Sequence, residues 1–142
     1  MIIGIAASLR YTLIGGDELN LAPSALWPEP VVVAEPKPEE GPVLVQIEYW
    51  IDLNRAREFE REMRNVRRVR RRDGATRWGL FRDPAEPGRF VESFLVESWA
   101  EHLRQHARGT ASDMEIEQSI KAFHSGPGQP AVTHLIAEHV PR

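Results

Sequence analysis

RFVESFLVESWAEHLRQHARG, residues 89–109, reads as a strand that turns directly into a helix. One face of its first half carries Phe90, Glu92, Phe94 and Val96, and the opposite face carries Val91, Ser93, Leu95 and Glu97. This alternation is typical of a half-buried strand. Ser98 and Glu101 have the spacing of a capping box, in which the hydroxyl accepts a bond from a free amide and the carboxylate binds back to the helix start. The stretch therefore predicts a strand followed by a helix that begins at Ser98.

Three further segments show strand-like patterns. They are VLVQIEYWI (43–51), ATRWGLFRD (75–83) and AVTHLIAEHV (131–140). The turn PAEPG at 84–88 joins the second of them to the strand at residue 89, which favours an antiparallel hairpin.

Two more helices are indicated by apolar residues spaced three and four apart. The first begins after a cap at Asp52 or Asn54 and ends at Asp73 and Gly74, because glycine enters the left-handed conformation at low cost. Its predicted apolar stripe is Leu53, Ala56, Phe59, Met63, Val66 and Val69 or Arg70. The second spans 112–124, stops at the Gly-Pro-Gly of 126–128, and carries Met114, Ile116 or Glu117, Ile120 and Phe123.

The resulting order is β-α-β-β-α-(α)-β, an α+β class fold with the ferredoxin-like arrangement. Its four antiparallel strands have helices on one face only. The strands nevertheless carry apolar residues on both faces, with Leu44 and Trp50 opposite Val45 and Ile47. We therefore predict a homodimer in which two sheets face each other.

The composition excludes several classes of chemistry. The chain has 142 residues, enough for one core, and no cysteine, so disulfides, thiolate metal sites and thiol nucleophiles are excluded. The apolar start at residues 1–9 is far shorter than the roughly 20 residues that cross a bilayer. It also lacks the basic start and processing pattern of a signal peptide.

The first 42 residues form a separate region in this interpretation. Residues 1–9, followed by Arg10 and Tyr11, are read as the end of a membrane segment, a first strand or a disordered terminus. Residues 14–42 are linker-like and rich in proline. Because Leu19, Trp27 and the valines at 31–33 are too apolar for a free tether, we expect part of this linker to lie along the domain or a partner subunit. The folded domain is expected at 43–142.

Several strings of the sequence resemble a known family. They are GPVLVQIEYWID, the run RRVRRRDGATRWGLFRDPAEPGRFVESFLVESWAEHLRQHAR and the late HLIAEH. They resemble the soluble carboxy-terminal domain of major facilitator superfamily transporters of the transmembrane secretion effector type, the group that includes enterobactin-exporter-like proteins. The domain itself resembles the antibiotic biosynthesis monooxygenase superfamily, whose fold is a dimeric α+β barrel. The string LNLAPSALWPEPVV resembles the linker after the last membrane helix of such transporters.

The resemblance implies a non-enzymatic, dimeric domain on the cytoplasmic side of an efflux transporter, or a free-standing relative, with a role in assembly or small-ligand sensing. Residues 1–9 would then be the tail of the last membrane helix, and residues 1–42 would connect to the membrane or transporter body. Two alternatives remain open. One is a cofactor-independent monooxygenase acting on an aromatic or polyketide-like compound, and the other is haem binding or degradation through His106 or His102. No cofactor is expected for the leading interpretation.

Nine arginines lie between Arg55 and Arg72, against three glutamates, Glu58, Glu60 and Glu62. A surplus of this size can bind phosphates. The arginines surround an apolar stripe, however, and the glutamates are spaced to pair with them, which is typical of a solvated helix. We favour a solvated face over contact with an anionic membrane or partner. We expect no nucleic-acid binding, because no aromatic residues interleave with the basic run.

His102 and His106 have the i,i+4 spacing that can bind a metal. The sequence offers no inner glutamate of an HExxH motif and no evident third ligand. We therefore predict no metal site, with His106 packing against the core or hydrogen-bonding locally and His102 on the solvent side.

The large aromatic residues indicate where a ligand pocket would lie between helices and sheet. The candidate lining residues are Trp50, Trp78, Phe94, Trp99 and His106. If the domain were an enzyme, the resemblance would assign catalysis to Trp78, Trp99 and His106. The asparagine, tryptophan and arginine or histidine sets of the characterised enzymes do not align here, so no catalytic residue is predicted and the tryptophans are read first as core residues.

Three strand glutamates, Glu48, Glu92 and Glu97, are candidates for buried carboxylates. Inside a dimer barrel such a group would have a raised pKa and could act as a base. Pairing with arginine is the more frequent outcome, and we expect the partners to come from the neighbouring hairpin, which supplies Arg77, Arg82 and Arg89.

Overall fold

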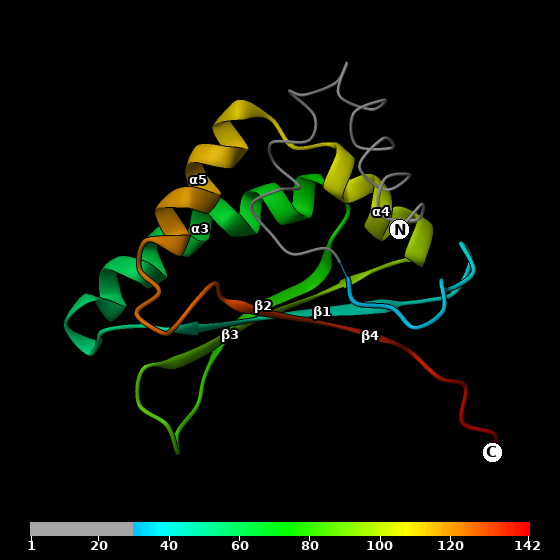
Figure 1. Cartoon of the computed structure of the whole chain (residues 1–142), viewed down its shortest axis with the longest axis horizontal. Coiled ribbons are helices and arrows are strands. Elements are labelled where there is room, and N and C mark those ends of the chain that lie inside the picture. Colours follow the sequence, from blue (N-terminus) through cyan, green and yellow to red (C-terminus); the bar gives the residue numbers. More distant parts are fainter. Residues whose placement is uncertain (1–29) are drawn as a thin grey trace, which may run out of the picture.

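The alternating segments pair into one antiparallel sheet. The computed structural model describes residues 30–142, in which three α-helices cover one face of four strands (Figure 1). The elements in chain order are β1 (Val43–Trp50), η2 (Leu53–Arg55), α3 (Ala56–Arg72), β2 (Thr76–Arg82), β3 (Arg89–Val96), α4 (Trp99–Ala107), α5 (Ala111–Lys121) and β4 (Ala131–Ile136). The strand order is β2-β3-β1-β4. This is the predicted ferredoxin-like α+β fold, with β1 and β3 at the centre.

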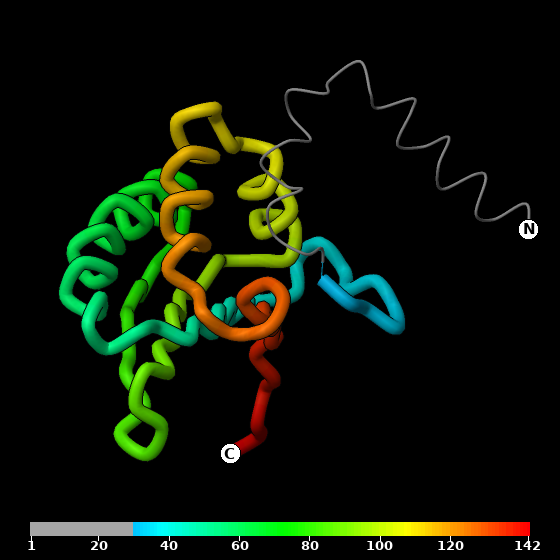
Figure 2. The backbone as a smooth tube through the Cα atoms, turned by 60° about the vertical axis from the view of Figure 1, so that its left-hand side comes forward, coloured from blue at the N-terminus to red at the C-terminus, as the bar shows by residue number. Residues whose placement is uncertain are grey.

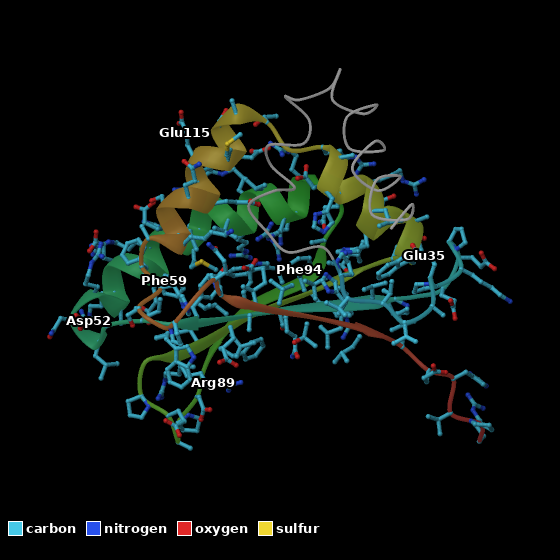
Figure 3. All side chains as sticks on the ribbon, in the orientation of Figure 1. Glu35, Asp52, Phe59, Arg89, Phe94 and Glu115 are labelled. Atoms are coloured by element: carbon cyan, nitrogen blue, oxygen red, sulfur yellow. The ribbon has the colours of Figure 1, made fainter. Side chains whose placement is uncertain are left out.

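The core lies between the sheet and the helices. Every second residue of β1 and β3 is buried, as the alternation predicted. Phe59 of α3 is the centre of an aromatic group, with ring centroids 5.3 Å from Tyr49, 5.5 Å from Phe90 and 5.8 Å from Phe123. Figure 3 shows Phe59 and Phe94 between helices and sheet, and Arg89 on the other side of the sheet. Figure 2 shows α5 running beside α3.

The start of the first helix differs from the prediction. Asp52 accepts a hydrogen bond from the Asn54 amide at 2.9 Å and caps the 3-10 turn η2, so α3 begins only at Ala56. Leu53 therefore does not belong to the apolar stripe, and its side chain is 62% exposed. The predicted end is confirmed, because Gly74 has a φ of +105° in the left-handed region.

The capping box predicted at Ser98 is only half formed. The Ser98 hydroxyl accepts from the Glu101 amide at 3.2 Å, but the Glu101 carboxylate pairs with Arg104 and Arg108 instead of binding back. A complete capping box occurs at the start of α5, between Thr110 and Asp113. Strand β4 ends at Ile136, four residues earlier than the pattern suggested.

The segment before β1 contacts the start of α4. The amide of Trp99 donates to the carbonyl of Glu40 at 2.7 Å, and the indole of Trp99 donates to the Glu35 carboxylate at 2.7 Å. The valines at 31–33 are exposed, so among residues 30–42 these contacts with α4 come from residues 35–40. The expectations for residues 1–9, Arg10, Tyr11 and the linker up to residue 29 lie outside the described residues. Within 30–142 no helix has the length and apolar character needed to cross a membrane.

No helix of the described chain covers the second face of the sheet (Figure 1), and this face carries apolar residues. The register aligns Leu95, Leu44 and Leu135 in one row across β3, β1 and β4. Leu135 is 49% exposed, and Phe81 on β2 is 59% exposed. The apolar second face predicted from the sequence is therefore present.

Candidate functional site

Two clusters of polar side chains lie in the layer between helices and sheet. The first, here the ionic cluster, consists of Tyr49, Arg70, Trp78, Glu92 and Glu117. The second, here the histidine cluster, consists of His102, His106 and His134. Burying polar groups is costly unless they bond to one another, so the bonding of each cluster indicates its role.

The ionic cluster is organised around Glu92, whose side chain is completely buried on β3. One of its oxygens accepts from Arg70 Nε and from Trp78 Nε1, each at 3.0 Å. The other accepts from the Tyr49 hydroxyl at 3.0 Å. Arg70 also donates to Glu117 on α5 at 3.0 Å. Glu92 thus receives three hydrogen bonds, two from neutral groups and one from a guanidinium, which offset the loss of its hydration.

The cluster also fixes the charge of its members. Burial would lower the pKa of the Arg70 guanidinium, but Glu92 and Glu117 raise it well above its ordinary value, so Arg70 stays charged. Burial, reinforced by the neighbouring Glu92 carboxylate, raises the pKa of Tyr49 well above 10.0, so the phenol stays neutral.

The partner predicted for Glu92 is wrong. Its guanidinium comes from Arg70 on α3, because the inward side of β3 faces the helices and not the hairpin arginines. The prediction is confirmed for Glu48, which pairs with Arg89 at 2.9 Å on the outer face. Glu97 is exposed at the end of β3.

A β-bulge brings Trp78 into the ionic cluster. Thr76 pairs with Leu95 and Gly79 pairs with Ser93, so two residues of β2 stand opposite one residue of β3. Arg77 takes a φ of +49° in this bulge. The shift turns Trp78 to the inner face, where its indole reaches Glu92.

The histidine cluster joins α4 to the edge strand β4. His102 and His106 lie one helical turn apart, and His134 alternates with Val132 and Ile136 on the inner side of β4. The ring centroid of His102 is 4.8 Å from that of His106 and 4.7 Å from that of His134. One nitrogen from each ring can be chosen so that all three lie within 4.8 Å of one another.

The prediction that His102 lies on the solvent side is wrong. Its side chain is 2% exposed and packs beside Trp99, with ring centroids 5.3 Å apart. Neither ring nitrogen of His102 has a hydrogen-bond partner among residues 30–142. A buried polar atom without a partner costs about 1–3 kcal/mol, so this arrangement needs an explanation.

Burial keeps two members of the histidine cluster, His102 and His134, uncharged. It lowers the pKa of His102 to about 3, and repulsion from His106 and His134 acts in the same direction. Burial likewise lowers the pKa of His134 to about 4, with His106 adding to the effect. Both imidazoles are therefore neutral near pH 7, which leaves a nitrogen lone pair on each.

A cavity of about 60 Å³ separates the two clusters. It is lined by Val45, Ile47, Val69, Arg70, Asp73, Phe94, His102, Gln105, His106, Gly109, Asp113, Glu117, Val132 and His134. Gln105 Nε2 is a further buried atom without a hydrogen-bond partner in the described part of the chain. The cavity is large enough for an ion with one or two waters, whereas pockets for drug-sized ligands measure about 300–1,000 Å³.

The residues predicted to line a pocket lie in different places. Phe94 and His106 line the cavity, whereas Trp78 belongs to the ionic cluster and Trp99 bonds to Glu35 at the start of α4. Trp50 lies on the outer face, where its indole donates to Glu48 at 2.9 Å. The cavity beside the histidines thus includes His106 of the suggested catalytic set but neither Trp78 nor Trp99.

Sequence reasoning missed His134 and Gln105. The signal for His134 was available, because its position in AVTHLIAEHV alternates with two apolar residues and so predicts an inward side chain. Gln105 gave no comparable signal, since a glutamine between two polar helix residues is usually exposed.

The four-stranded ferredoxin-like fold matches several solved structures. An antibiotic biosynthesis monooxygenase candidate from Caulobacter crescentus CB15 superimposes with a TM-score of 0.60 at 20% identity, covering 72% of this chain and 94% of that one. A similar candidate from Bordetella bronchiseptica superimposes with a TM-score of 0.58 at 18% identity, covering 72% of this chain and 100% of that one. SnoaB, a cofactor-independent oxygenase from Streptomyces nogalater, superimposes with a TM-score of 0.51 at 13% identity, covering 72% of this chain and 97% of that one. At these identities the likeness establishes the fold.

The sequence itself identifies the family. The family model described as "Transmembrane secretion effector" matches residues 1–142, and the chain belongs to this family. The comparison with curated proteins finds no match.

Proposed function

We propose that this domain is a non-enzymatic, dimeric appendage of a transmembrane secretion effector, on the cytoplasmic side, with a role in assembly or in sensing a small ligand. Family membership supports the link to secretion. The linker contact supports communication with the transporter body, because residues 35–40 bind the first turn of α4, the helix that carries His102 and His106.

The observation that carries the dimer is the apolar outer face of the sheet. The leucine row of Leu95, Leu44 and Leu135 crosses three strands, and Phe81 lies on the same side. Covering such a face with a second copy removes apolar surface from water, at about 25 cal/mol per Å². An isologous contact also brings the same row of each subunit together.

The small cavity favours sensing or assembly over oxygenation. A volume of about 60 Å³ in one chain is several-fold below that of pockets for drug-sized ligands, and a polyketide-like compound or a haem is of at least that size. To use the site beside the histidines, the two catalytic alternatives would need a larger cavity there, formed with a second subunit or by opening of α4.

Light scattering coupled to size exclusion tests the dimer. The wild type is expected at twice the chain mass, and Leu135→Arg at the mass of one chain, because the arginine would be buried in the interface without a partner. Leu103→Arg is the matched control: Leu103 is 45% exposed but lies on α4, away from the sheet face. A monomeric wild type, or equal dimer content in both variants, contradicts the proposal.

A further inference from the structure

We propose that His102, His106 and His134 bind a divalent first-row transition metal ion, with zinc as the reference ion. The inference goes beyond the proposed function and does not rest on it, since binding is a property of the domain whether or not it serves a transporter.

The ligand geometry is close to that of a metal site. Tetrahedral zinc with Zn–N bonds of about 2.0–2.1 Å places its nitrogens about 3.3 Å apart. The three histidine nitrogens already lie within 4.8 Å of one another. Side-chain rotations that move the nitrogens by about an ångström would bring them to the spacing of a tetrahedral zinc site. Two ligands come from adjacent turns of α4 and the third from β4, so the three do not share one line.

The unmatched nitrogens point to a missing partner. In a purely structural cluster, buried polar atoms bond to neighbouring groups. His102 is buried, yet within 30–142 neither of its nitrogens has such a neighbour. A metal ion accepts a lone pair from an imidazole nitrogen, and His102 can offer one without breaking a hydrogen bond to any described residue.

The cavity supplies the remaining coordination position. Three protein ligands plus water is the pattern of zinc sites with an open position. The cavity beside the histidines has room for that water. It also exposes the Gln105 amide, whose Nε2 has no acceptor in the described chain and can donate to a metal-bound oxygen.

The local charge favours a cation. Three carboxylates, Asp73, Asp113 and Glu117, line the cavity together with the Arg70 guanidinium. Arg72 ion-pairs with Asp73 and Asp113 from outside. The five groups leave one net negative charge beside the histidines, and attraction to a divalent ion is strong where water is excluded.

Calorimetric titration with zinc tests the site on chain 1–142, purified without a histidine tag and stripped with a chelator. The wild type is expected to bind one ion per chain. His102→Phe and His134→Gln are expected to weaken binding by about 100-fold or more, because each removes one ligand. His139→Gln is the matched control, since His139 is exposed and outside the cluster, and its affinity should equal that of the wild type.

Two outcomes overturn the inference: no binding by the wild type at about 100 µM zinc, or wild-type affinity in either cluster variant. Cobalt substitution keeps the test decisive if a variant fails to fold. Cobalt bound to the wild type should give the intense visible absorption of a four-coordinate ion, and zinc should abolish it. A spectrum equal to that of cobalt in water contradicts the site.

Discussion

The ionic cluster and the histidine cluster border the same buried cavity, but their buried polar groups are bonded in opposite ways. Glu92 receives bonds from three different strands and helices, and Arg70 joins two carboxylates. His102 is equally buried, and no group in the described part of the chain bonds to its nitrogens. A buried polar group with internal partners specifies packing, whereas one without them indicates a ligand.

Breaking the ionic cluster is expected to have the largest effect on stability. Glu92→Gln removes the buried negative charge while Arg70 stays charged, and loss of one member of a buried ion pair costs about 3–5 kcal/mol. Denaturant unfolding measures this loss. Glu48→Gln is the control, because its pair with Arg89 is about one-third exposed and contributes under about 1 kcal/mol. Similar losses of unfolding free energy in Glu92→Gln and Glu48→Gln would contradict a structural role for the buried ionic cluster.

Tyr49→Phe weakens the same cluster more gently. Loss of the hydrogen bond to Glu92 should lower the free energy of unfolding by about 1–2 kcal/mol at pH 7. The folded state keeps the phenol neutral because its pKa is raised, while the unfolded phenol ionises near pH 10, so this contribution is complete below pH 10 and decreases above it.

The wild type should therefore lose about 1.4 kcal/mol per pH unit relative to Tyr49→Phe as the pH rises above 10. Unfolding curves of the two proteins at several alkaline pH values measure the difference. If the unfolding free energies of the two proteins changed in parallel with pH, Tyr49 would have the same pKa in the folded and unfolded chains, which contradicts the prediction.

His102→Phe should have the smallest effect and the opposite sign. In the presence of chelator, phenylalanine keeps the ring packing beside Trp99 and removes two polar atoms that lack partners within 30–142. We expect the unfolding free energy to rise by about 1 kcal/mol. With zinc added, only the wild type should gain stability. A clear loss of stability in chelator would mean that the His102 nitrogens are bonded in the folded protein.

The sequence was most informative where periodicity governs structure. The strands, the helix end at Gly74 and the inward position of Glu92 follow from alternation and glycine conformation. Local choices between competing bonds were less predictable. The Glu101 carboxylate could either cap the helix start or pair with the arginines three and seven residues later, and in the structure it pairs with both arginines.

The candidate site was less predictable than the fold because its residues come from distant segments. The spacing of His102 and His106 is visible in the sequence, but their meeting with His134 depends on which helix covers β4. Arg70 shows the same limit: its position on the apolar stripe was ambiguous, and only the three-dimensional arrangement brings Glu92 and Glu117 to it.

The most direct test of the contrast between the two clusters is a crystal structure of the zinc-loaded chain with an anomalous difference map at the zinc edge. We predict a peak about 2.0–2.1 Å from one nitrogen of each of His102, His106 and His134, with the ionic cluster unchanged. Absence of a peak there, with the His102 nitrogens bonded to protein groups or ordered water, would contradict the account.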